Sequence, residues 1–252
     1  MVWRWNRSRV RWCPWPLALL AVVLVAVSHA QQPAVPAQPG GSPSAGASGR
    51  VVEAGEIHRD GSRAYIFVGK TGLGHEHAVV GQIKQGAVRL DGSGHHGEIV
   101  FAMDTFTADT DAARKHIGLE GTKDASTQQQ VTANMRGSDV LDVQRFPTAT
   151  FAITSVQPQS QPSRRGLPQY QLDGDFTLHG VTRPIRVVAD VEEANGWLHL
   201  RGGFSILQTQ FGITPYTKAF GAVGVTDRLD IWGDLWVAKE RGVVQQASRP
   251  VR

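Results

Sequence analysis

The sequence predicts a mainly all-β domain, an antiparallel β-barrel or curved sandwich of about eight strands with a short helical insertion. Apolar and polar residues alternate with a period of two over much of the chain, which is typical of antiparallel strands with one buried face. Turn-forming pairs separate these runs, and the helical patterns are gathered in one mid-chain insertion. A barrel of about eight strands encloses room for packed side chains or one small ligand.

The alternation is clearest in the second half of the chain. Tyr170, Leu172, Gly174, Phe176 and Leu178 share one face of a predicted strand. The last predicted strand places its apolar residues inside and Asp230, Trp232, Asp234 and Trp236 outside. We therefore expect strands at residues 62–70, 79–90, 97–106, 148–156, 170–178, 181–191, 197–206 and 229–237.

Two kinds of local signal punctuate these strands. His179-Gly180 and Asn195-Gly196 fall between strand runs and predict tight turns. Residues 109–119 and 126–135 have helical spacing, and we expect each helix to lie against the sheet or over its open end. Asp109 or Asp111 is expected to cap the first helix. Ser126 and Gln129 resemble a capping box for the second.

The two ends of the chain are expected to lie outside the domain. Residues 1–30 combine four arginines, an eleven-residue apolar run and a small-residue site after Ala30, which predicts a cleaved signal peptide. A membrane span needs about 20 apolar residues, so no integral membrane anchor is expected. Residues 31–49 predict a flexible linker, 50–240 the folded domain and 241–252 a C-terminal tail.

Removing the predicted leader changes the charge and redox arguments. The whole chain has 26 Lys and Arg against 22 Asp and Glu. Four of the arginines and no acid belong to the leader, so the mature chain is formally neutral and nucleic-acid binding is not expected. The only cysteine, Cys13, also lies in the leader, so stability must come from an apolar core. No nucleotide-binding phrase suggests a cofactor.

Several phrases of the chain together resemble the YceI-like family. The matching pieces are Lys70-Thr71-Gly72, Gly74-His75-Glu76-His77, Val140-Leu141-Asp142, residues 145–151 (RFPTATF), residues 174–184 (GDFTLHGVTRP) and Gln210-Phe211-Gly212-Ile213. The resemblance covers roughly residues 50–237. It implies a secreted, periplasmic lipocalin-like barrel that binds polyisoprenoids or other long amphiphilic lipids, such as isoprenoid quinones. The loop at 157–168 and the His-rich turn at 74–77 depart from plainer members.

The resemblance leads us to expect an apolar cavity and no catalytic residue. The function predicted is transport, storage or sequestration of the lipid, by a protein that is not an enzyme. An alternative for every lining residue is that it fills a solid core. The expected lining residues are Phe101, Met103, Phe151, Ile153, Leu172, Phe176, Leu178, Ile185, Val187, Leu200, Phe204 and Ile231.

Two other functions remain open at this point. His75 and His77 project to the same side of an extended segment and are candidate metal ligands, with a third from His95, His96 or His116. This would give a metal-binding or metalloenzyme role. Trp232 and Trp236 could instead serve a filled-core interaction module, or pack beneath the helices or the C-terminal tail. A homodimer along an exposed edge strand is also allowed.

Overall fold

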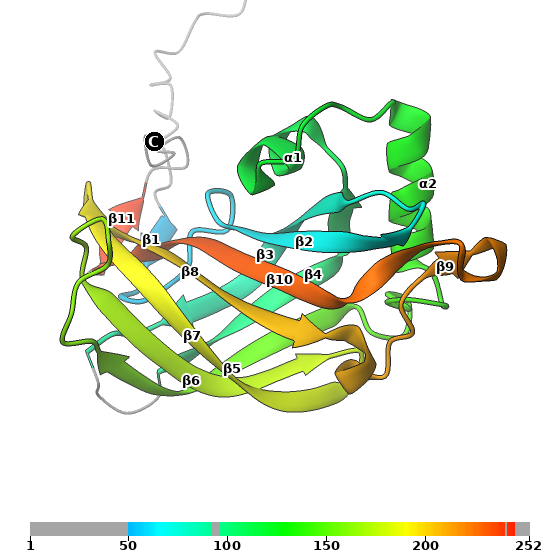
Figure 1. The fold of residues 1–252 in the computed structure, drawn as a ribbon. Helices are drawn as coiled ribbons and strands as arrows, with labels where there is room; N and C mark the ends of the chain where they lie inside the picture. Colours follow the sequence, from blue (N-terminus) through cyan, green and yellow to red (C-terminus); the bar gives the residue numbers. More distant parts are fainter. Residues whose placement is uncertain (1–49, 92–95, 240, 245–252) are drawn as a thin grey trace, which may run out of the picture. The chain divides into compact units, whose positions relative to one another are not determined.

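Eight antiparallel strands close into a barrel in the computed structural model of the protein, which describes residues 50–91, 96–239 and 241–244. The strands follow one another in chain order around the ring, and pairing of the last with the first closes it (Figure 1). They are β2 (Arg63–Gly72), β3 (His77–Val88), β4 (Gly97–Ala108), β5 (Thr148–Pro158), β6 (Gln169–Leu178), β7 (Val181–Ala194), β8 (Trp197–Leu207) and β10 (Val223–Ala238). The predicted fold class is confirmed.

The largest difference from the predicted strands lies in β10. It begins at Val223, six residues before the expected start at Leu229. The pairing of β10 with β2 shifts register between Val225 and Leu229. Such an irregularity interrupts the alternation of faces, so the first part of β10 is hidden from a period-two pattern.

Short elements extend this barrel. β9 (Thr217–Lys218) pairs with the beginning of β10, and the 3₁₀ turns η1 (Gln208–Phe211) and η2 (Ala219–Gly221) flank it. β1 (Arg50–Val52) pairs with β11 (Gly242–Val244) in a separate two-stranded sheet. β11 lies within the segment that we predicted as a C-terminal tail. The predicted leader, the linker and residues 245–252 lie outside the described residues.

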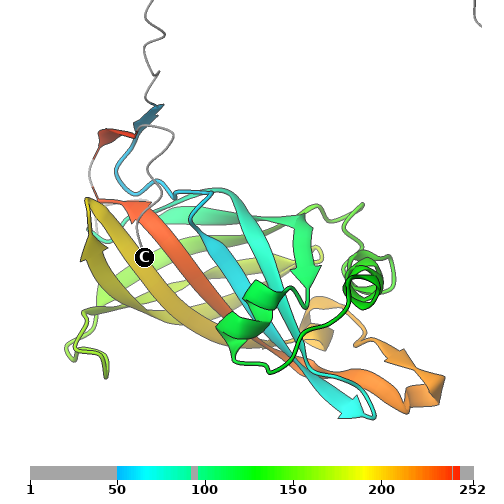
Figure 2. The same cartoon turned by 90° about the horizontal axis from the view of Figure 1, so that it is seen from above.

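The two helices lie at one end of the barrel. α1 (Asp111–Ile117) packs against β2 and β3, and α2 (Ala125–Arg136) packs against β4. Figure 2 shows α2 end-on beside the barrel. The side chain of Thr132 accepts a hydrogen bond from the backbone N–H of Ala108, and Arg136 donates to the carbonyl of Phe106. These bonds fix α2 over the end of β4.

The caps of both helices differ from the prediction. Thr110, not Asp109 or Asp111, caps α1 by accepting from the backbone N–H of Ala113. Asp124, not Ser126, caps α2, and its carboxylate accepts from both the backbone and the hydroxyl of Thr127. A carboxylate two residues earlier outcompetes the predicted Ser126–Gln129 box because it satisfies both groups of Thr127.

Both predicted hairpin turns are confirmed. His179 and Gly180 have φ of +52° and +75°, and Asn195 and Gly196 have +52° and +79°. Two successive positive φ values are what a two-residue type I′ turn requires. The His179 ring reaches away from its own turn, and its Nδ1 lies 3.3 Å from the carbonyl oxygen of Phe211.

The outer face of β8 and β10 carries a second small apolar cluster. Val52, Trp197, Trp236 and Ala238 pack together there. Trp236 does lie on the outer face, but it is buried beneath the segment that follows β1 and not beneath the helical insertion. Asp234, which we predicted to face solvent, is also buried, whereas Trp232 is 39% exposed. Trp236 is therefore packed, as one of the two alternatives predicted, and of the two tryptophans only Trp232 is exposed enough to serve as a contact.

Helices in the described residues are all too short or too polar to cross a membrane.

Candidate functional site

A cavity of about 180 Å³ lies inside the barrel at the end where α2 packs. Its walls come from β2, β3, β4, β5, β6, β8 and β10, and α2 adds Val131 and Met135 from one face. Val140 and Leu141, which follow α2, complete the apolar lining. The loop phrase Val140-Leu141 is therefore part of the site wall.

A second, smaller cavity of about 60 Å³ lies farther along the same strands, away from α2. Phe101, Phe176 and Phe204 line both cavities. The ring of Phe176 meets Phe101 edge-on at 6.3 Å and Phe204 at 5.4 Å between centroids. These three rings, here called the phenylalanine partition, separate the two cavities.

The structure brings ten of the twelve predicted lining residues to a cavity wall. Phe101, Met103, Phe176, Leu178, Phe204 and Ile231 line the larger cavity, and Phe151, Leu172, Val187 and Leu200 line the smaller one. Ile153 and Ile185 line neither of the two cavities. Ile153 is part of the buried core, and the partly buried Ile185 packs against that core. Sequence reasoning missed the walls from β2 and α2, although Val131 and Met135 do share one helix face. That these residues contact a ligand stays a prediction.

Four polar side chains line the larger cavity, and all come from its α2 end. They are His77, Asn134, Gln208 and Tyr216. The side-chain amide of Asn134 donates to the Tyr216 hydroxyl at 3.3 Å, and that of Gln208 donates to the carbonyl of Thr226 at 2.8 Å. The cavity is thus apolar along its length and polar at one end.

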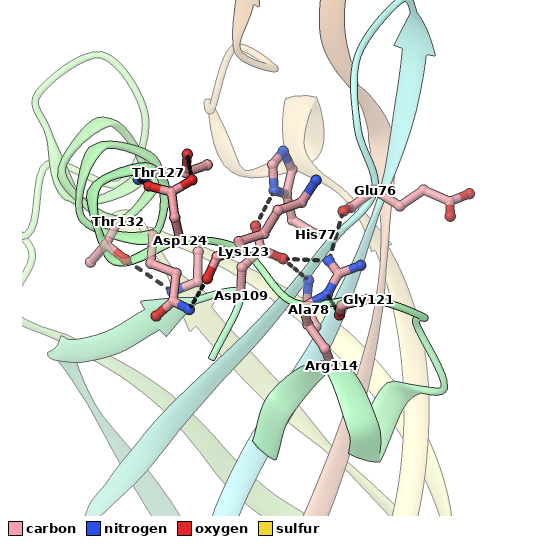
Figure 3. A network of polar contacts seen from close by, with 12 residues as sticks. Glu76, His77, Ala78, Asp109, Arg114, Gly121, Lys123, Asp124, Thr127 and Thr132 are labelled. Atoms are coloured by element: carbon pink, nitrogen blue, oxygen red, sulfur yellow. Dashed lines mark hydrogen bonds and ion pairs between the residues drawn. The ribbon is translucent and has the colours of Figure 1, made fainter. Parts of the chain in front are cut away.

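The most strongly held of these groups is His77 (Figure 3). Its Nδ1 lies 2.6 Å from Oδ2 of Asp109. Oδ1 of Asp109 accepts from Nη1 of Arg114 at 2.9 Å and from the backbone N–H of Ala78 at 3.2 Å. Arg114 in turn donates to the carbonyl of Gly121 at 2.8 Å. A fully buried carboxylate therefore orients the imidazole.

The charge state of Asp109 follows from these contacts. Burial raises its pKa, but the hydrogen bond and charge of His77, the Ala78 N–H and the Arg114 guanidinium together lower it further. The pKa of Asp109 lies below its ordinary value, so the carboxyl is ionised and accepts hydrogen bonds only. Sequence reasoning assigned this residue to a helix cap and missed the network.

The predicted metal ligands are not assembled in the described part of the chain. His75 is exposed, His77 is bonded to Asp109, and the ring of His116 stacks on Tyr65 at 3.6 Å. No group of three or more His, Cys, Asp or Glu side chains there could hold a metal ion. His95 lies outside the described residues.

Comparison with known proteins gives one family match. The model of the YceI-like domain matches residues 56–235. A UPF0312 protein of Pseudomonas putida is 30% identical over 145 residues, which are 54% of this chain and 70% of the relative. A UPF0312 protein from another strain of this species is 30% identical over 131 residues, which are 50% of this chain and 63% of that relative. A UPF0312 protein from Vibrio vulnificus is 37% identical over 73 residues, which are 28% of this chain and 35% of that protein.

Solved structures with a similar arrangement share little sequence with the chain. Burkholderia cenocepacia BcnA has a TM-score of 0.45 at 14% identity, covering 69% of this chain and 96% of that one. A polyisoprenoid binding domain from Saccharophagus degradans has a TM-score of 0.45 at 10% identity, covering 74% and 99%.

Proposed function

The chain belongs to the YceI-like family, and from this premise we propose that it is a binding protein for a long-chain amphiphilic lipid, such as a polyisoprenoid or an isoprenoid quinone. The observation that carries the proposal is the larger cavity, which is apolar along its walls and polar only at the α2 end. Such a site suits an apolar chain with one polar end. A filled core, which the interaction-module alternative requires, does not agree with this cavity.

The energetics favour a hydrocarbon ligand. Burying each methylene is worth about 0.8 kcal/mol, so a few five-carbon units suffice to drive binding. The larger cavity has room for about six water-sized groups at ~30 Å³ each. It therefore holds the head group and the first isoprene unit or two of a long chain. We propose that the rest extends past the phenylalanine partition into the smaller cavity.

The predicted signal peptide supports a proposal for the compartment in which the protein acts. It directs the chain to the periplasm, where a carrier could transport, store or sequester a lipid that water does not dissolve. The proposal is for a carrier and not an enzyme, with no resident cofactor.

Titration with the isoprenoid alcohols geraniol and farnesol tests the proposal by calorimetry. Phe176→Asp places a charge in the wall of both cavities and abolishes uptake. Phe220→Asp is the matched control, because Phe220 is fully exposed and the same change there leaves affinity unaltered.

A second variant covers the case in which Phe176→Asp does not fold. Ala149 lines the larger cavity and is 2% exposed. Ala149→Phe fills the space without adding charge, so we expect a folded protein that binds neither alcohol. Unchanged affinity in this folded variant would contradict the cavity assignment.

A further inference from the structure

The turn Gly74-His75-Glu76-His77 has a built geometry that lipid burial alone does not explain. A Cβ at Gly74 would lie 2.4 Å from the carbonyl oxygen of Gly224, so the turn packs directly on the β10 backbone. The Glu76 carbonyl accepts from Arg114, and His75 is exposed. The result is that His77 alone turns its ring inward, where it lines the larger cavity.

The partner of His77 determines which ring nitrogen carries the proton. The ionised carboxylate of Asp109 only accepts hydrogen bonds, so Nδ1 of His77 must be the N–H donor. In the neutral ring the other nitrogen, Nε2, is then an acceptor. Figure 3 shows this second nitrogen pointing away from Asp109. No side chain or backbone group among the described residues forms a hydrogen bond with it.

The other polar side chains of the cavity form hydrogen bonds of their own. Asn134 donates to Tyr216, and Gln208 donates to the backbone. The acceptor on His77 differs from the amide oxygens of these two residues because a buried, ionised carboxylate fixes the orientation of its ring and the position of its proton. Resting on the lipid-binding function proposed above, we propose that His77 Nε2 accepts a hydrogen bond from a hydroxyl at the polar end of the ligand, with Asp109 as the positioning residue. Alcohols and quinols are then preferred over ethers and oxidised quinones with the same chain.

A pair of probes that differ in whether the terminal oxygen carries a hydrogen or a methyl group tests this inference. Geraniol has a hydroxyl that donates and accepts, whereas geranyl methyl ether only accepts. The calorimetric titration is run at about pH 8, because only a neutral imidazole offers an acceptor at Nε2. We expect the unaltered protein to bind geraniol roughly five- to tenfold more tightly than the ether, which corresponds to one hydrogen bond. In His77→Phe this ratio falls to about one, and in His75→Ala, the exposed control of the same turn, it is unchanged.

Asp109→Asn provides a second variant that retains the imidazole. Arg114 and the Ala78 N–H both donate to Oδ1, so the amide oxygen of an asparagine stays there and its NH₂ group faces His77. Nδ1 must then accept, and the proton moves to Nε2. We expect this variant to bind the ether several-fold more tightly than the unaltered protein does. Nitrogen NMR of His77 reports the exchanged tautomer directly.

The outcomes separate this inference from the function on which it rests. Binding of both probes with the same ratio in all four proteins would overturn the role of His77 and leave the lipid carrier standing. Failure of the unaltered protein to bind either probe would overturn the carrier and this inference together. A ratio that collapses in His77→Phe, with tighter ether binding in Asp109→Asn, supports both.

Discussion

Two histidine–aspartate pairs with the same nitrogen-to-oxygen distance lie in different regions of the molecule. In one pair Nδ1 of His77 is 2.6 Å from Asp109, at the α2 end of the cavity. In the other, Nε2 of His199 is 2.6 Å from Asp234, on the outer face of the barrel. The His199 ring stacks on Trp236, with centroids 4.1 Å apart.

The surroundings of each pair, and not the bond itself, decide its role. His77 lines the wall of a cavity, whereas the buried ring of His199 stacks on Trp236, which the segment after β1 contacts. Ser62 in that segment accepts a hydrogen bond from the backbone N–H of Trp236 at 2.9 Å. The first pair is therefore placed to meet a ligand, and the second supports the ring of Trp236, whose backbone holds the segment after β1.

Removing the carboxylate from the first pair should have the largest effect on stability. Asp109→Ala leaves the buried Arg114 guanidinium without its ion-pair partner, and breaking a buried pair costs about 3–5 kcal/mol. Urea unfolding of the variant measures this loss. Asp109→Asn, which keeps an acceptor for Arg114, should lose much less. A cost below about 1 kcal/mol for Asp109→Ala would contradict the buried network.

Removing the aromatic partner of the second pair should destabilise the fold without affecting ligand binding. Trp236→Ala removes a side chain that is 4% exposed, and truncation of a buried tryptophan costs about 3 kcal/mol or more. Trp232→Ala on the same strand is the comparison for stability alone, because that ring is 39% exposed but also lines the smaller cavity. Weaker ligand binding in Trp236→Ala would show that the two regions are coupled.

Opening the partition should alter which chain lengths bind. Phe204→Ala removes a ring shared by both cavities, at a cost of about 2 kcal/mol because Phe204 is only partly buried. We expect farnesol to gain affinity relative to geraniol, since added methylenes are buried at about 0.8 kcal/mol each. Titrating both alcohols against the variant measures the gain. An unchanged preference would mean that the chain does not pass the partition.

Lowering the pH should produce the smallest effect on stability, because it protonates Asp109 of the first pair. The pKa of this carboxyl is lowered in the folded protein, so the unfolded chain takes up the proton first as the pH falls. The stability from Asp109 is complete above the ordinary value of 3.8 and is lost as the pH falls through the lower folded pKa. Between neutral pH and about pH 3.5, the urea midpoint of Asp109→Asn should fall less than that of the unaltered protein. An equal fall in both proteins would contradict this assignment.

The alternation of residues predicted the barrel because each strand meets two different environments. It placed Phe101, Phe176 and Phe204 inside for the same reason. It could not show that Trp236 is covered, since burial on the outer face depends on a segment 174 residues earlier that forms no regular strand there. A side chain that points outward from the barrel can therefore still be buried by another segment.

The polar end of the site was less predictable for a related reason. Asp109 precedes a helix, and local sequence alone favours a cap for such an aspartate. Its actual partners, His77 and Arg114, lie 32 residues before it and 5 after it. The contribution of α2 to the cavity likewise depends on where tertiary contacts place that helix.

Native mass spectrometry of the protein purified from the cells that make it, followed by organic extraction, tests the central claim most directly. We expect a bound species with a polyisoprenoid fragmentation pattern, present in the unaltered protein and absent from Ala149→Phe. A ligand-free mass for the unaltered protein, with nothing in the extract, would contradict the claim that this barrel carries a lipid.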